Sequence, residues 1–189
     1  MQPFRGSASQ EVGVKVLCMS SLVLILIVLY STAKTNDKDK TCAYFSSYAD
    51  VKINPVGGSL AFILALVFSV SFYRIAARYA PYTVVVFCVL FPFIWLTSTY
   101  TFSNIHRITT IATILAGSMC IVTILRLSSH RVLKLSLSAV AILSVLGLGT
   151  VWLTKCNLNH QRSKDTMQRI INSLYLVLLS VLFFSIALA

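Results

Sequence analysis

Few residues in this 189-residue chain carry groups that could catalyse a reaction or bind a metal. Paired carboxylates, the usual acid–base and metal-binding groups, do not occur within its long apolar runs. A buried carboxylic acid, which a proton-coupled transporter usually needs, is also absent from these runs. The five acidic residues all lie outside those runs, as Glu11, Asp37, Asp39, Asp50 and Asp165. These features favour a protein that is not an enzyme, without settling the question.

The histidines and the sequence motifs give no other chemistry. His106, His130 and His160 each flank an apolar run, without the spacing of zinc or haem ligands. The chain has no Cys-x-x-Cys pair, no Gly-x-Ser-x-Gly elbow and no phosphate-binding glycine loop. We expect no metal and no cofactor.

Two cysteines lie outside the apolar runs, Cys42 in a polar segment and Cys156 after the fifth run. If the chain crosses a membrane six times, both lie on the same side. Outside the cytosol they would form a disulfide that ties the first loop to the last. The alternative is two unrelated free thiols. The other cysteines lie within runs and are expected to be small packing residues: Cys18, Cys88 and Cys120.

The composition indicates a lipid environment. The chain is 57% hydrophobic and 11% charged, with a mean hydropathy of +0.84, whereas soluble domains are about 25% charged. Six runs are apolar and helical in length, so we predict an all-α integral membrane protein with a compact bundle of about six transmembrane helices. Residues 1–189 form one polytopic domain, and 32–56 form a polar extramembrane loop. The runs are 12–31, 57–73, 82–100, 108–127, 132–154 and 170–189.

The first run has a second interpretation as a cleaved signal peptide, which would leave five helices. Arg5 and Lys15 lie at its start, and Ser31-Thr32-Ala33 resembles a cleavage site. The apolar stretch reaches back to Val12 and is long for a signal peptide, so we favour an uncleaved anchor.

The net charge of +11 comes from basic residues that lie mostly between the runs, where they would meet lipid headgroups rather than nucleic acid. They divide almost evenly between the two sides. The short loops 74–81 and 126–134 contain no acidic residue, and we expect them in the cytosol. Arg74 and Arg78 are four apart, so they are predicted to share a helix face and contact lipid headgroups.

Small residues recur at four-residue spacing, which permits close helix contact in lipid. We expect these stripes to pack within the bundle; the alternative is that one faces a partner. Asn172 is the only amide near the core of a run, and it would bond across helices or, alternatively, contact a polar ligand. The stripes are Ala61, Ala65 and Ser69 in the second run, and Ala112, Ala116 and Cys120 in the fourth.

Three function classes follow from this organisation. The first is a non-catalytic accessory, assembly or scaffold subunit that acts through helix contacts with a membrane-protein partner or a second copy. The second is a facilitator, channel or transporter for a neutral or lipidic solute. The third is a lipid-modifying enzyme. We favour the first because it fits the scarcity of catalytic groups and the small-residue stripes. The protein would be multi-pass, in an endomembrane or the plasma membrane.

Overall fold

The computed structural model describes residues 8–36, 55–97, 103–127 and 131–154, together with 170, 173–174, 177–184 and 186. All regular secondary structure in these ranges is helical. The helices are α1 (Ala8–Asn36), α2 (Pro55–Ala76), α3 (Pro81–Leu96), α4 (Ser103–Leu127) and α5 (Arg131–Thr154). The described residues of the last run are helical as well, and 177–184 are called here the C-terminal segment.

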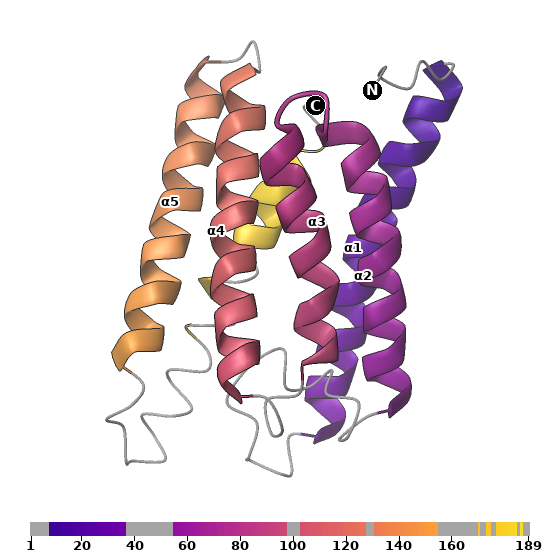
Figure 1. The fold of residues 1–189 in the computed structure, drawn as a ribbon, viewed down its shortest axis with the longest axis vertical. Coiled ribbons are helices and arrows are strands. Elements are labelled where there is room, and N and C mark those ends of the chain that lie inside the picture. The colour runs from indigo at the N-terminus through magenta and orange to yellow at the C-terminus, as the bar shows by residue number, and fades with distance from the viewer. Residues whose placement is uncertain are drawn as a thin grey trace.

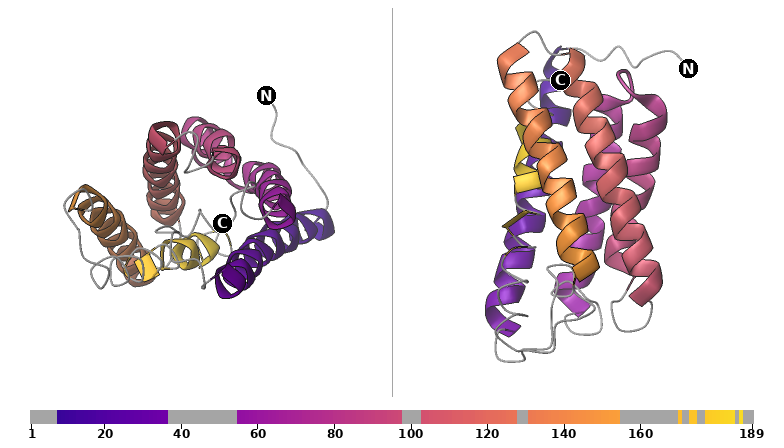
Figure 2. Two further views of the ribbon diagram at one scale, coloured as in Figure 1. Left: turned by 90° about the horizontal axis from the view of Figure 1, so that it is seen from below. Right: turned by 90° about the vertical axis from the view of Figure 1, so that its left-hand side faces the viewer.

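The five helices run up and down in chain order, each packed against the one before it (Figure 1). Seen along the helix axes, they form an arc, and the C-terminal segment lies between α5 and α1 (Figure 2). The α2–α3 turn, the end of α4 and the start of α5 therefore lie at the same end of the bundle as the start of α1 (Figure 1). This end is called the upper end below.

The prediction of six spans is met in part. Three helices are long and apolar enough to cross a membrane: Ala8–Val28, Pro55–Ala76 and Asn104–Arg126. The apolar helical stretches Pro81–Leu96 and Lys134–Gly147 are shorter. At 1.5 Å per residue, the 16 residues of α3 extend about 24 Å, less than the ~30 Å of a hydrocarbon core. A six-helix membrane bundle is therefore not established by these lengths.

Helix α3 ends at Leu96, before the predicted limit of residue 100, because Thr97 caps it. Thr97 is extended, with φ −87° and ψ 105°, and its backbone N–H donates to the Phe93 carbonyl. Its hydroxyl lies 3.0 Å from the Phe93 oxygen and 3.3 Å from the Ile94 oxygen. These contacts satisfy carbonyls that the last turn of a helix would otherwise leave unpaired.

Two other helices are longer than predicted. Helix α1 continues to Asn36 rather than residue 31, and α2 passes Arg74 to end at Ala76. An arginine near a helix end can keep its apolar stem in lipid while its guanidinium reaches the interface, so Arg74 does not terminate α2. Helix α3 also continues through Pro92.

Aromatic side chains on α2 and α3 form the centre of the core. Phe68 and Phe72 stack at 5.6 Å between ring centroids, and Phe68 lies 5.1 Å from Phe91. Phe87 meets Phe72 edge-on at 5.4 Å, and Trp95 extends the row edge-on from Phe91 at 6.2 Å. All five are buried. Such pairs add about 0.5–1.5 kcal/mol each beyond their buried area, so they hold the α2–α3 hairpin together.

Candidate functional site

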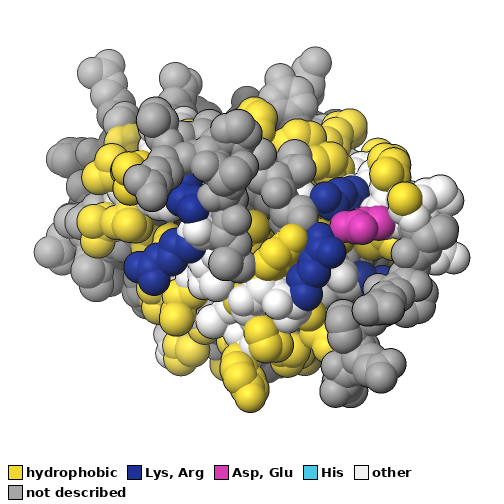
Figure 3. Space-filling model, turned by 90° about the horizontal axis from the view of Figure 1, so that it is seen from above, with side chains coloured by type: hydrophobic (Ala, Val, Ile, Leu, Met, Phe, Trp, Pro, Cys, Tyr) yellow, Lys and Arg dark blue, Asp and Glu magenta, His cyan; other side chains and the backbone are white. Residues whose placement is uncertain are grey.

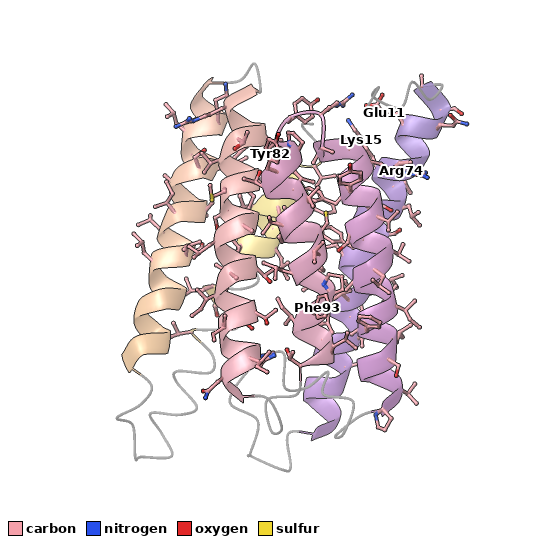
Figure 4. The ribbon with its side chains drawn as sticks, viewed as in Figure 1. Glu11, Lys15, Arg74, Tyr82 and Phe93 are labelled. Atoms are coloured by element: carbon pink, nitrogen blue, oxygen red, sulfur yellow. The ribbon has the colours of Figure 1, made fainter. Side chains whose placement is uncertain are left out.

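The described cationic side chains gather at the upper end of the bundle (Figure 3). Arg74 lies in the last turn of α2 and Arg126 in the last turn of α4, while Lys134 lies in the first turn of α5. Lys15 and Arg74 point from neighbouring helices at this end, close to Glu11 (Figure 4). The fifth cation, Arg78, lies in the α2–α3 turn.

Arg78 forms the ion pair of this end. Its Nη2 donates to Glu11 Oε1 at 3.0 Å, which joins the start of α1 to the α2–α3 turn. The guanidinium also lies over the Tyr79 ring, 4.8 Å from its centroid. The predicted shared helix face of Arg74 and Arg78 is wrong, because α2 ends at Ala76 and Arg78 belongs to the turn.

The hairpin between α4 and α5 is tied at the same end. The Lys134 ammonium donates to the backbone carbonyl of Arg126. A lysine placed on the last carbonyls of a helix also complements the negative end of its dipole. Two basic residues from consecutive helices thus lie side by side. Their sequence separation of eight gave no signal of this, since the turn between them decides it.

Most residues of the two small-residue stripes are buried within the bundle. Ala61 and Ala65 are fully buried in α2, and Ser69 is nearly so. In α4, Ala116 and Cys120 are buried and Ala112 is half-buried. Close contact also occurs at Gly117, where a Cβ atom would lie 3.0 Å from Phe87 Cε2. The sequence shows this glycine, but nothing in it identifies Phe87 as the neighbour.

A small apolar cavity of about 30 Å³ lies between α3, α4 and the C-terminal segment. Phe87, Gly117, Leu178 and Leu182 are among its lining residues. Among its described lining residues, Thr113 is the one with a hydroxyl group, and it donates to the Thr109 carbonyl of its own helix at 2.7 Å. Since a water molecule needs two to four polar partners, this cavity favours an apolar occupant or none.

Several described hydroxyls within the helices bond to the carbonyl three or four residues earlier, which satisfies them without a partner helix. Ser21, Thr83, Ser118 and Thr123 are examples. Three buried polar atoms in the described ranges have no hydrogen-bond partner: Ser69 Oγ, Trp95 Nε1 and Thr110 Oγ1.

His106 closes the opposite end of α3 and α4. It is buried in the first turn of α4, and its Nδ1 lies 3.0 Å from Thr97 Oγ1. The pair joins the cap of α3 to the start of α4. No group of three or more His, Cys, Asp or Glu that could hold a metal occurs among the residues for which the structure gives positions.

Three of the predicted site residues lie outside the described residues, namely Cys42, Cys156 and Asn172. The structure gives no support to the Cys42–Cys156 disulfide. The cysteines that it does describe, Cys18, Cys88 and Cys120, are free. Cys18 contacts the Phe68 carbonyl across the α1–α2 interface, with its Sγ 4.0 Å from that oxygen.

The aromatic core is the feature that the sequence analysis missed. Phe68 and Phe72 are four residues apart, as are Phe87, Phe91 and Trp95, and this spacing places each set on one helix face. The spacing was therefore available as a signal. Comparison with known proteins adds no further assignment, since no family model, curated protein or solved structure matches the chain.

Proposed function

We propose that this protein is a multi-pass membrane bundle that acts as a non-catalytic accessory, assembly or scaffold subunit. One observation carries the proposal. All five helices expose large apolar side chains on their outward faces. Examples from successive helices are Val16, Ile63, Val89, Leu115 and Leu143, each at least 50% exposed. Soluble monomers rarely present such continuous apolar surface, whereas lipid and neighbouring membrane helices cover it.

The shorter helices are part of the same proposal. Helix α3 lies between α2 and α4, both of which are long enough to cross a membrane (Figure 1). A helix in that position crosses the same layer, and local thinning of the bilayer accommodates a short span at modest cost. With α5 and the C-terminal segment beside them, this arrangement favours six spans.

Packing of α1 supports the uncleaved anchor over the signal peptide. Cys18, Leu22 and Ile25 are buried, and α1 packs against α2 more extensively than any other pair of consecutive helices. Removal of α1 would expose the Phe68 carbonyl that Cys18 contacts. The bundle therefore favours a retained first helix.

The interior supports a role at the helix surfaces rather than along a solute route. The aromatic row from Phe68 to Trp95 fills the space between α2 and α3, and the small cavity beside it is apolar. A facilitator, channel or transporter for a neutral or lipidic solute stays the alternative, and a lipid-modifying enzyme is the second alternative. Solute flux into liposomes that contain only this protein tests the facilitator, with Asn172→Leu as the variant that would block a route through this amide.

Purification in a mild detergent, followed by mass spectrometry, tests the accessory role. We expect a second membrane protein, or a second copy of the chain, in fixed stoichiometry. A single protomer without a partner would contradict the proposal. Two tryptophan variants then locate the contact, Leu143→Trp on α5 and Val89→Trp on α3. Added bulk at the contact lowers the yield of the partner, and bulk that faces lipid does not.

A further inference from the structure

The described side chains at the upper end of the bundle carry an excess of positive charge. Among the side chains that the structure places there, five are cationic and one, Glu11, is anionic. Glu11 is held by Arg78 at 3.0 Å on the side of α1. The cations at the α4–α5 hairpin lie apart from this pair, in a second group of basic side chains (Figure 3). The five cations are Lys15, Arg74, Arg78, Arg126 and Lys134.

Arg126 and Lys134 are brought together by the fold itself. The Lys134 ammonium is bonded to the Arg126 backbone carbonyl, so two positive residues share the end of one hairpin. Two like charges at one end of a hairpin repel each other, and an anion bound beside them relieves the repulsion. A phosphate group is the anion that arginine and lysine side chains bind most readily in a membrane protein.

Exposed tyrosines at the upper end favour a lipid headgroup as the source of the phosphate. Tyr82 at the start of α3 is 87% exposed, and Tyr73 in the last turn of α2 is also exposed. Exposed tyrosines of this kind lie at the headgroup level of a bilayer. Directly below Tyr82 on α3, the exposed side chains are apolar, as at Val85 and Val86. The cations therefore project where the lipid-facing surface ends.

We propose that Arg126 and Lys134, together with Lys15 and Arg74, bind the headgroups of anionic phospholipids. The inference rests on the proposed membrane-spanning bundle and concerns lipid selectivity, and it holds whether or not the protein has a protein partner.

Native mass spectrometry of the purified full-length protein tests the site. The protein is titrated with equal amounts of phosphatidylglycerol and phosphatidylcholine, which have the same acyl chains. The wild-type protein should retain phosphatidylglycerol preferentially, and added salt should remove the preference by screening. One basic residue at an anionic surface contributes about a fivefold gain in binding. The variant Arg126→Gln with Lys134→Gln should therefore lose roughly twenty-five-fold in affinity for the anionic lipid.

The matched control is the charge-conserving variant Arg126→Lys with Lys134→Arg, which should keep the preference. Glycerophosphoglycerol, the same headgroup without acyl chains, should not displace the lipid. Three results would overturn the proposal. They are a wild-type protein that binds both lipids equally, a preference that survives in the double glutamine variant, and displacement by the soluble headgroup. The salt titration uses the wild-type protein, so it decides the matter even if the glutamine variant fails to fold.

Discussion

Packing of Phe87 on Gly117 makes the most specific structural prediction. A Cβ atom at Gly117 would lie 3.0 Å from Phe87 Cε2 and 3.2 Å from Cδ2. The Phe87 ring cannot move away freely, because Phe72 lies 5.4 Å and Phe91 5.5 Å from its centroid. Overpacking of this kind costs about 1–3 kcal/mol. We therefore expect Gly117→Ala to lower the free energy of unfolding, although alanine is the better helix former by about 1 kcal/mol.

Gly13 provides the matched control, since a Cβ atom there would meet nothing within 4 Å. Gly13→Ala should leave the stability unchanged or raise it by up to about 1 kcal/mol. The assay is unfolding of the purified protein in mixed micelles, followed by circular dichroism. In the Phe87→Leu background the added methyl group has room, and Gly117→Ala should become nearly neutral. A double-mutant cycle should thus give a coupling energy of about 1 kcal/mol or more. Equal effects at both glycines, with no coupling to Phe87, would refute this account of the α3–α4 contact.

Three further predictions use the same unfolding assay. Phe91→Ala should lower the free energy of unfolding by about 3–5 kcal/mol because the ring is buried. Phe93→Ala should lower it clearly less, because that ring is 48% exposed on the same helix, and equal losses would contradict the assigned faces of α3. Ser69→Ala should raise the stability by about 1 kcal/mol, since it removes a buried hydroxyl without a partner, and a loss would indicate an unrecognised contact. Glu11→Gln should lower the free energy of unfolding by less than about 1 kcal/mol, because the ion pair with Arg78 is about half exposed. Salt at 1 M should abolish the difference from the wild-type protein, and a large, salt-insensitive loss would contradict an exposed ion pair.

The sequence predicted the helices well where a single physical property decides them. Apolar runs of about 20 residues specify helices in lipid, and each predicted run contains described helical residues. The limits of the helices were less certain, because local side chains decide them. Helix α3 ends early because Thr97 leaves the helical conformation, with ψ 105°, while Arg74 does not stop α2. Neither outcome follows from hydropathy.

The candidate site depends on contacts between helices, which the sequence does not encode in any local pattern. Four-residue spacing of small residues indicated faces for close packing, and it would equally have indicated the aromatic row from Phe68 to Trp95. The spacing does not indicate which helix packs against each face. That Phe87 rests on Gly117, or that Lys134 reaches the Arg126 carbonyl, depends on the order and tilt of the helices. Counting basic residues could not orient the chain either, because the two sides are nearly equal.

Cysteine labelling in sealed membranes tests the membrane-spanning bundle most directly. In a background with Cys42 and Cys156 replaced by serine, one reporter is Arg78→Cys in the α2–α3 turn. The other is Asn104→Cys in the first turn of α4, at the opposite end of the bundle. A membrane-impermeant maleimide should label only one of the two reporters before the membrane is permeabilised, and both afterwards. Labelling of both reporters in intact membranes would mean that α3, which lies between them in the chain, does not cross the bilayer, and it would contradict the account.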